Sequence, residues 1–326
     1  MWEIKDKVME FTYLIDKIKD AEFEEHPFKH IYIENFFEHS DFKSITGAPE
    51  ISLGECKTDE DLFARLFEND YKVISFPGCT TDYKEYIRKH SHGEPLTSHT
   101  ACESSGIALR LSPKDEMLVA LDRFLASDSF NEAIAEKFGI EYASCNVDGG
   151  IQKYLDGYEI SPHPDIRRKA ATFMVNINPH QDSEKHDHHT HYLKLNSDYQ
   201  YVREFWESTP KAERQWVPWE WCTTEFLQTK NNSIVLFSPA DDTMHGVKAN
   251  YNHLVTQRTQ LYGNLWYKSD NTSFAPTWEE LRARDFSAPP TSRNPLSEPL
   301  RSVKGIAKKL IKPLIPKDPN IGDREH

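Results

Sequence analysis

The chain has 326 residues, of which 38% are hydrophobic, so it is long enough to bury the core of one large domain or two modest ones. Its formal net charge of −13 at pH 7 argues against broad contact with nucleic acid, because phosphate backbones bind basic surfaces. The five cysteines form no CxxC pair, the N-terminus is charged throughout, and no apolar run reaches about 18 residues. These features predict reduced thiols in a cytoplasmic protein without a signal peptide or a membrane span.

The first part of the chain, residues 1–148, is predicted to be rich in helices. Apolar residues recur at the spacing of one helix face in three segments, 2–20, 57–69 and 113–138. The last of these segments is predicted to break near Ser127–Ser129. Short apolar runs that end at turn residues predict strands at 30–37, 71–76 and 105–112.

From residue 149 onward the predicted elements are mainly strands. They are separated by polar or Pro/Gly-containing segments and lie at 151–155, 158–163, 169–178, 191–195, 233–237 and 256–267. A Trp-rich segment at 197–226 is predicted to interrupt them as an insertion. The pattern predicts an α+β chain with a mainly β core at about 149–268, a double-stranded β-helix (jelly roll) buttressed by N-terminal helices. We expect residues 1–283 to form a single catalytic domain.

The C-terminal segment, 284–326, has a different composition. Residues 284–299 are rich in Pro and Ser and are expected to be irregular, whereas residues 299–326 hold seven Lys or Arg against three Asp or Glu. The apolar residues of 300–315 fall near one face of a predicted basic helix. Such a helix either packs on its own domain or makes peripheral contact with an anionic membrane or a partner, and the sequence leaves these alternatives open.

One combination of residues in the second part has the chemistry of a metal site. His163 and Asp165 are two apart on a predicted strand, so both side chains face the same side. His245 lies 80 positions after Asp165, in a segment that a jelly roll would bring alongside. Two imidazoles and one carboxylate are the ligands of the facial triad that holds non-haem Fe(II). Arg258, 13 positions after His245, would be a buried cation in need of an anion, and a dicarboxylate cosubstrate is a suitable one.

The motifs around these residues resemble the iron core of prolyl-4-hydroxylase-like Fe(II)/2-oxoglutarate-dependent dioxygenases. The resemblance is carried by the stretch Tyr154-x-x-Gly157-x5-His163-x-Asp165, by the strand at 168–178 and by the strand at 233–237 before His245. The run HIYIENFF at 30–37 is similar to the opening strand of that family. The resemblance concerns the iron core and does not reach a peptide groove, so the family's substrate is not transferred to this chain.

The resemblance implies Fe(II) on the two histidines and the aspartate, with 2-oxoglutarate and O₂ as cosubstrates and ascorbate as an additional reductant. It implies that Arg258 binds the distal carboxylate of 2-oxoglutarate together with Tyr154. Thr190 and Asn176 are further candidate contacts for the cosubstrate. The family places its basic residue closer to the distal histidine than Arg258 lies here, so a small insertion near 250–253 is expected.

Two clusters provide candidate substrate contacts. The first is the histidine tract 186–191, from which we select His189. A solvated loop and a separate metal site are alternative explanations of this tract. The second is the Trp-rich segment, from which we select Trp219 and Trp221 as aromatic walls of a substrate pocket. These tryptophans are equally well explained as a satellite core under a long loop.

We therefore expect an oxygenase that hydroxylates an unactivated C–H bond of a small-molecule, carrier-linked or glycan-linked substrate, with release of succinate and CO₂. Halogenating relatives carry a small residue in place of the carboxylate, so Asp165 disfavours halogenation, while desaturation and oxidative cyclisation stay open. A cupin-like metalloenzyme that does not use 2-oxoglutarate is one alternative. A non-enzymatic jelly-roll binding protein with a membrane-associating basic tail is another.

Overall fold

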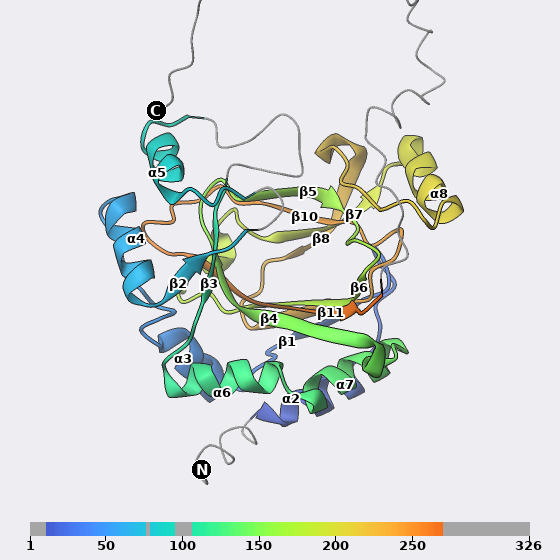
Figure 1. Ribbon diagram of the computed structural model, residues 1–326, viewed down its shortest axis with the longest axis horizontal. Coiled ribbons are helices and arrows are strands. Elements are labelled where there is room, and N and C mark those ends of the chain that lie inside the picture. The colour runs from blue at the N-terminus through green and yellow to red at the C-terminus, as the bar shows by residue number, and fades with distance from the viewer. Residues whose placement is uncertain (1–10, 76–78, 95–105, 270–326) are drawn as a thin grey trace, which may run out of the picture. The chain divides into compact units, whose positions relative to one another are not determined.

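The described part of the chain, residues 11–75, 79–94 and 106–269, consists of two antiparallel sheets and a set of helices (Figure 1). In this computed structural model all of these residues belong to one compact unit. The predicted helix at 300–315, the rest of 284–326 and the start of the predicted helix at 2–20 lie outside the described residues. Within the described ranges, no helix is both long enough and apolar enough to cross a bilayer.

The larger sheet has seven strands in the order β1-β9-β6-β11-β4-β3-β2. Their bounds are Ile31–Glu34 (β1), Tyr71–Val73 (β2), Ala108–Leu111 (β3), Cys145–Tyr154 (β4), Lys169–Asn176 (β6), Ser233–Phe237 (β9) and Arg258–Tyr267 (β11). The smaller sheet has four strands in the order β5-β10-β7-β8. Their bounds are Glu159–His163 (β5), Thr190–Leu195 (β7), Cys222–Gln228 (β8) and His245–Lys248 (β10). After β4, the chain therefore passes repeatedly between the two sheets.

The described α-helices lie mostly in the first part of the chain. Their bounds are Tyr13–Asp20 (α2), His39–Gly47 (α3), Asp59–Glu68 (α4), Tyr83–Ser91 (α5), Glu116–Leu125 (α6), Asp128–Phe138 (α7) and Gln200–Ser208 (α8). Short 3₁₀ turns cover Tyr142–Ser144 (η2), Ser183–Lys185 (η3), Ser197–Tyr199 (η4) and Trp219–Trp221 (η5). The predicted break near Ser127 separates α6 from α7, because the Ser127 hydroxyl accepts from the Phe130 N–H and caps α7.

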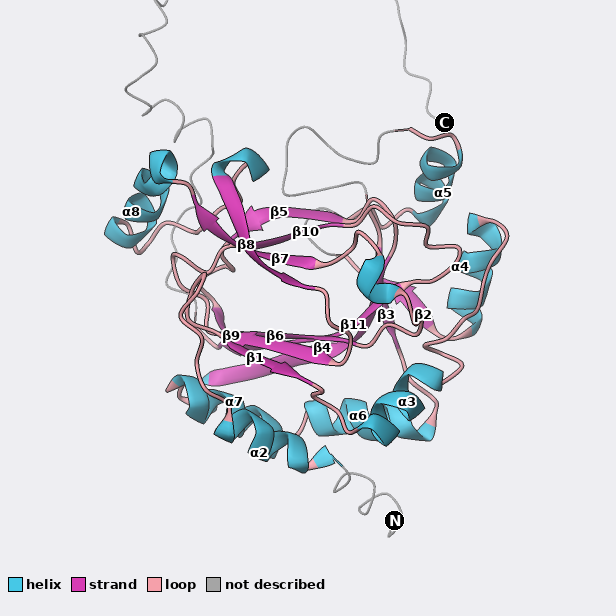
Figure 2. Ribbon diagram, turned by 180° about the vertical axis from the view of Figure 1, so that it is seen from behind, coloured by secondary structure: helices cyan, strands magenta, loops and turns pink. Residues whose placement is uncertain are grey.

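The larger sheet is buried on both faces. Helices α2, α3, α6 and α7 cover its outer face, and the smaller sheet lies opposite its inner face (Figures 1 and 2). Alternate residues of a strand point to opposite faces, so Phe173 and Leu261 pack in the core under the helices, while Met174 and Tyr262 pack between the sheets with Tyr192 of β7. Polar groups on the inner faces of β6 and β11 therefore point toward the smaller sheet.

The structure confirms a chain of mainly antiparallel sheets with supporting helices. It also contains elements that sequence patterns did not predict, namely α3, α5 and the strand β8, which begins at Cys222 inside the predicted insertion 197–226. The four cysteines of the described residues are free, as expected for reduced thiols: Cys56, Cys79, Cys145 and Cys222.

Candidate functional site

The two histidines of the predicted triad lie opposite each other in the smaller sheet. β5 and β10 are antiparallel neighbours whose register pairs His163 with His245, and the two ring centroids are 4.4 Å apart. The turn through Pro164 brings Asp165 against both rings, with Oδ1 3.9 Å from Nε2 of His163 and Oδ2 3.9 Å from Nε2 of His245. One donor atom from each of the three residues lies within 4.8 Å of the others.

Both imidazoles are oriented as metal ligands. Nδ1 of His163 lies 2.8 Å from the carbonyl oxygen of Ser161, and Nδ1 of His245 lies 3.0 Å from that of Thr243. Because a carbonyl oxygen only accepts, each Nδ1 carries the proton and each Nε2 keeps a lone pair that faces Asp165. Burial lowers the pKa of His163 to about 3 and also lowers that of His245, so both rings are neutral at neutral pH.

Asp165 is held by two donors that sequence reasoning did not select. Lys169 Nζ donates to Oδ1 at 2.5 Å, and Thr172 Oγ1 donates to Oδ2 at 2.6 Å. Lys169 also donates to the hydroxyl of Tyr262 at 2.9 Å. Burial alone would raise the pKa of Asp165, but the Lys169 ammonium and the two imidazoles outweigh it and hold this pKa below its usual value. The carboxylate is therefore charged and fixed in orientation.

Arg258 is a buried cation without an acidic partner among the described residues. It is 2% exposed and begins β11, where the register places it beside Tyr154 of β4. Its guanidinium carbon lies 4.7 Å from the centre of the Tyr154 ring, and Nη2 donates to Thr190 Oγ1 at 3.0 Å. Burial lowers the pKa of Arg258, and the surrounding tyrosines oppose this shift. The site thus brings Arg258, Tyr154 and Thr190 together and offers a positive charge to an incoming anion.

His188 is a second group with unmet hydrogen-bonding capacity close to Arg258. The residue is 1% exposed, and neither ring nitrogen has a hydrogen-bond partner within the described part of the chain. Its ring lies 4.8 Å from that of Tyr251, and burial, together with the charge of Arg258, lowers its pKa to about 2. The neighbouring His189 is also buried, but its Nε2 lies 3.2 Å from the carbonyl oxygen of Glu184. The histidine tract is therefore not a wholly solvated loop.

The expected insertion between His245 and Arg258 is held by hydrogen bonds. The hydroxyl of Tyr251 donates to the carbonyl oxygen of Tyr154 at 2.5 Å and accepts from the Arg258 N–H at 2.9 Å. Asp156 accepts from the Tyr251 N–H at 2.9 Å through Oδ1. Tyr251 therefore holds this segment against the turn after β4 and fixes the point at which Arg258 enters β11. That the segment is an insertion stays a prediction.

A second cluster of imidazoles and carboxylates anchors the same segment. Asp59 lies 2.7 Å from His253 Nε2 and 2.8 Å from His90 Nδ1, and Asp156 lies 3.2 Å from His90 Nε2. His253 Nδ1 accepts from the Asp156 N–H at 3.0 Å, so its Nε2 carries the proton that bonds Asp59. These bonds satisfy both rings without an ion, although three of the groups lie close enough together to bind one. We interpret the cluster as a hydrogen-bonded network.

The remaining predicted contacts have partners within the protein. The Asn176 amide nitrogen donates to the carbonyl oxygens of Gln228 and Lys230 at 3.0 and 3.1 Å. Trp219 Nε1 donates to Glu159 Oε1 at 2.7 Å, and Trp221 stacks on Tyr199 with ring centroids 4.5 Å apart. Roles for Asn176, Trp219 and Trp221 in cosubstrate or substrate binding stay predictions.

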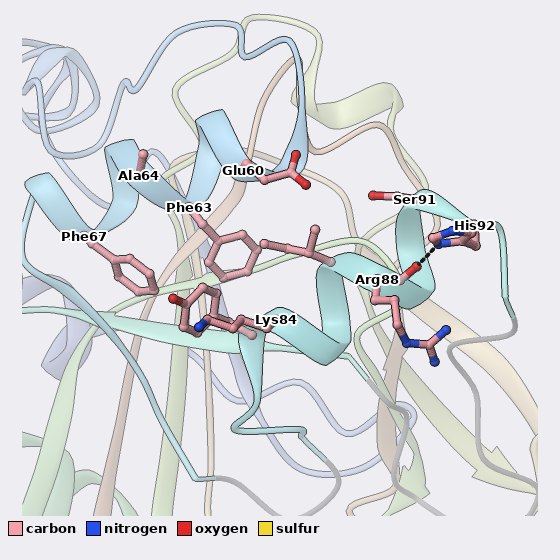
Figure 3. Close-up of a pocket in the computed structure, with 10 residues that line it drawn as sticks. Glu60, Phe63, Ala64, Phe67, Lys84, Arg88, Ser91 and His92 are labelled. Atoms are coloured by element: carbon pink, nitrogen blue, oxygen red, sulfur yellow. Dashed lines mark hydrogen bonds between the residues drawn. The ribbon is translucent and has the colours of Figure 1, made fainter.

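A pocket of about 270 Å³ adjoins the metal donors. His163 and Asp165 form part of its wall, and Lys169, Trp216 and Trp266 line it as well. Of the Trp-rich segment, it is thus Trp216 that lines this pocket. A different depression, of about 630 Å³, lies between α4 and α5 (Figure 3). Its lining of Phe63, Phe67 and neighbouring residues includes no member of the triad, so we leave it out of the candidate site.

This chain is similar to several solved structures at low sequence identity. No family profile matches the chain, and no curated protein matches it. A prolyl hydroxylase from Trichoplax adhaerens, solved with a hypoxia-inducible-factor peptide, is similar over 82% of this chain and 94% of its own, with 11% identity and a TM-score of 0.41. A Pseudomonas putida prolyl-4-hydroxylase is similar over 78% and 98%, with 13% identity and a TM-score of 0.35.

HygX from Streptomyces hygroscopicus, solved with nickel, 2-oxoglutarate and hygromycin B, is similar over 65% of this chain and 87% of its own, with 12% identity and a TM-score of 0.27. Solved structures similar to this chain thus include prolyl hydroxylases and an oxidoreductase of the 2-oxoglutarate/Fe(II) oxygenase family.

Proposed function

We propose that this chain is an Fe(II)- and 2-oxoglutarate-dependent oxygenase that hydroxylates an unactivated C–H bond of a small molecule or biosynthetic intermediate. The observation that carries the proposal is that one donor atom from each of His163, Asp165 and His245 lies within 4.8 Å of the others. The burial of Arg258, which has no acidic partner among the described residues, supports it. The passage of the chain between these sheets supports a double-stranded β-helix. We propose residues 1–283 as its catalytic domain.

The donor set fits Fe(II). Two neutral imidazoles and one carboxylate are the donor set that non-haem iron oxygenases use to bind the metal. His163, Asp165 and His245 would hold the ion. The carbonyl partners of both Nδ1 atoms and the two donors to Asp165 act as the outer support that metal ligands need for a fixed orientation.

The surroundings of Arg258 fit the distal carboxylate of 2-oxoglutarate. Arg258 supplies the charge and a planar fork of donors, and Thr190 positions that fork. The ring of His188, which has no hydrogen-bond partner among the described residues, supports an acceptor at this place, because a buried imidazole gains a hydrogen bond when a carboxylate binds beside it. Tyr154 contributes its ring face, while its hydroxyl lies 2.5 Å from the Gln152 side chain.

Fe(II) with 2-oxoglutarate and O₂ supplies, when bound, the oxidising power for C–H hydroxylation, with succinate and CO₂ as coproducts. The chain's own residues have three tasks. Lys169 and Thr172 keep Asp165 charged and oriented, burial keeps the two imidazoles neutral, and the walls of the adjoining pocket place one C–H bond toward the metal side.

Anaerobic spectroscopy tests the proposal. Addition of 2-oxoglutarate to the Fe(II)-loaded protein should produce a weak visible charge-transfer band, and admission of O₂ should yield succinate. His163→Ala should lose Fe(II) binding and both signals, whereas the matched control His39→Ala, at an exposed position of α3, should keep them. A folded wild-type protein that binds Fe(II) but shows no band with 2-oxoglutarate would refute the cosubstrate assignment and favour a metalloenzyme that does not use it.

A further inference from the structure

The pocket beside the metal donors is small and is bounded by described residues. Its volume of about 270 Å³ lies just below the roughly 300 Å³ at which small-molecule pockets begin. One part of its wall is the segment 213–216, which Val217 ties to the end of β5 by donating from its N–H to the Pro162 carbonyl oxygen at 2.7 Å. If the proposed function is right, a substrate that reaches the metal through this pocket contacts that segment. A substrate class assigned from this wall therefore rests on the proposed function.

Arg214, in this wall, is a buried cation whose partners are incomplete. It is 6% exposed, and its Nε has no hydrogen-bond partner among the described residues. The one carboxylate that forms an ion pair with it there is Asp241, at 3.8 Å from Nη1, which is beyond hydrogen-bond length. That same carboxylate oxygen lies closer, at 3.3 Å, to Arg167 Nη2. A buried guanidinium with one distant, shared carboxylate has capacity for a further anion.

The other charged groups around the pocket are already occupied. Lys169 donates to Asp165 and to Tyr262. Arg167 donates from Nε to the Ala212 carbonyl oxygen at 2.8 Å and from Nη2 to that of Trp206 at 2.7 Å. The carboxylate of Glu213 accepts from the backbone N–H of Arg167 and of Arg214 through Oε1, so it holds the wall in place. Arg214 is therefore the cation of this wall that has donors to offer a ligand.

The rest of the lining is suited to an apolar body. Trp216 and Trp266 contribute aromatic surface, and Ile160 and Ile166 contribute aliphatic surface. Arg214 lines the same small pocket as the metal donors His163 and Asp165. A ligand that contacts both Arg214 and the metal side is therefore short.

We infer that the substrate is a small carboxylate-bearing molecule with an apolar body, whose carboxylate binds the Arg214 guanidinium while its body lies between the pocket tryptophans and presents a C–H bond to the metal. This deepens the proposed function by naming the chemical class of its substrate. Guanidinium groups pair with carboxylates through two parallel hydrogen bonds, which gives orientation as well as affinity.

Paired probes test the inference by binding rather than by turnover. 3-Phenylpropanoate and indole-3-acetate are compared with their primary amides and with phenyl phosphate, by saturation-transfer NMR on the Zn(II)-loaded protein saturated with 2-oxoglutarate. The excess cosubstrate keeps Arg258 occupied. At least one acid should bind about tenfold or more tightly than its amide in the wild-type protein. Arg214→Gln should abolish this preference, and Arg214→Lys should restore part of it.

Arg203→Gln is the matched control, because the Arg203 side chain is 43% exposed and pairs with Glu207 on α8. This variant should keep the full preference. Four results would each overturn the inference. They are equal binding of acid and amide, no binding of any probe at millimolar concentration, tighter binding of phenyl phosphate than of both acids, and an unchanged preference in Arg214→Gln. If Arg214→Gln does not fold, the wild-type comparison and Arg214→Lys still decide. A wild-type charge-transfer band without acid selectivity defeats this inference alone, whereas absence of that band defeats the proposed function.

Discussion

The imidazole of His90 should make the stability of this protein depend on pH. His90 lies between two carboxylates, and the hydrogen bonds to Asp156 and Asp59 raise its pKa from 6.5 to about 9. A histidine whose pKa is raised on folding stabilises the folded state in its protonated form. The contribution is therefore complete below pH 6.5 and is lost as pH rises through about 9.

The size of this contribution follows from the shift of the pKa. The difference between about 9 and 6.5 is about 2.5 pKa units, and at about 1.36 kcal/mol per unit this amounts to roughly 3.4 kcal/mol. The His90 side chain is 23% exposed, so solvent screens part of the interaction, and about 2 kcal/mol is the expected effect. The pKa of Asp59 is lowered by its hydrogen bonds to His253 and His90, and because the His90 part is the same interaction, it is not added again.

Denaturant unfolding of His90→Gln and wild-type protein between pH 6 and pH 9.5 measures this effect. The variant should be about 2 kcal/mol less stable near pH 6, and the difference should shrink toward zero near pH 9.5. Other titrating groups contribute equally to both proteins and cancel in the difference. His39→Gln, at an exposed position of α3, should match the wild type throughout. A difference that stays constant across this range, or that grows with pH, would refute the charged-histidine explanation.

Three further substitutions test other parts of the site and core. Arg258→Gln should weaken 2-oxoglutarate binding by about 100-fold in calorimetry while Fe(II) binding persists, because a buried charge-assisted contact is lost; equal affinity would contradict the anchor. His188→Leu should weaken 2-oxoglutarate binding about tenfold yet leave the ligand-free protein as stable or more stable, because an unpartnered buried imidazole is removed; a loss of stability without ligand would contradict this. Gly263→Ala should lower the free energy of unfolding in urea by about 2–3 kcal/mol, because the added Cβ would lie 2.2 Å from the Phe173 ring. Gly47→Ala, with open space around it, should leave the free energy of unfolding unchanged.

Strand periodicity located much of the sheet framework from sequence. Segments with several apolar or β-branched residues, such as 169–178 and 233–237, became β6 and β9. β8 was not predicted, and β10 was expected only as a short segment around His245. β10 is His-Gly-Val-Lys and carries no apolar alternation of its own. Its strand conformation comes from pairing with β5 on one side and β7 on the other, which is tertiary information.

The triad could be selected from sequence because its chemistry is visible in residue type and spacing. His163 and Asp165 needed only the two-residue repeat of a strand, and His245 was found in the segment expected to lie alongside. The environment of the triad could not be selected in this way. Lys169 matters through its contact with Asp165, which a one-residue change in the register of β6 would remove. His188 matters because its ring nitrogens have no partner among the described residues, which requires the fold to be known.

The rule that a buried cation requires a partner selects candidates but does not rank them. The rule pointed to Arg258 and applies equally to Lys169 and Lys153, which also lie in predicted strands. Lys153 is 0% exposed, yet its Nζ donates at 2.8 Å to the Ile51 carbonyl oxygen and at 2.8 Å to Thr259 Oγ1, and burial lowers its pKa to about 7. Neutral acceptors on the helix-covered face therefore satisfy Lys153, whereas Arg258 faces the space between the sheets with one side-chain acceptor. A structural cation and a ligand anchor differ in the strand face on which they lie and in how many of their donors lack an acceptor. Both properties are known only once the fold is known.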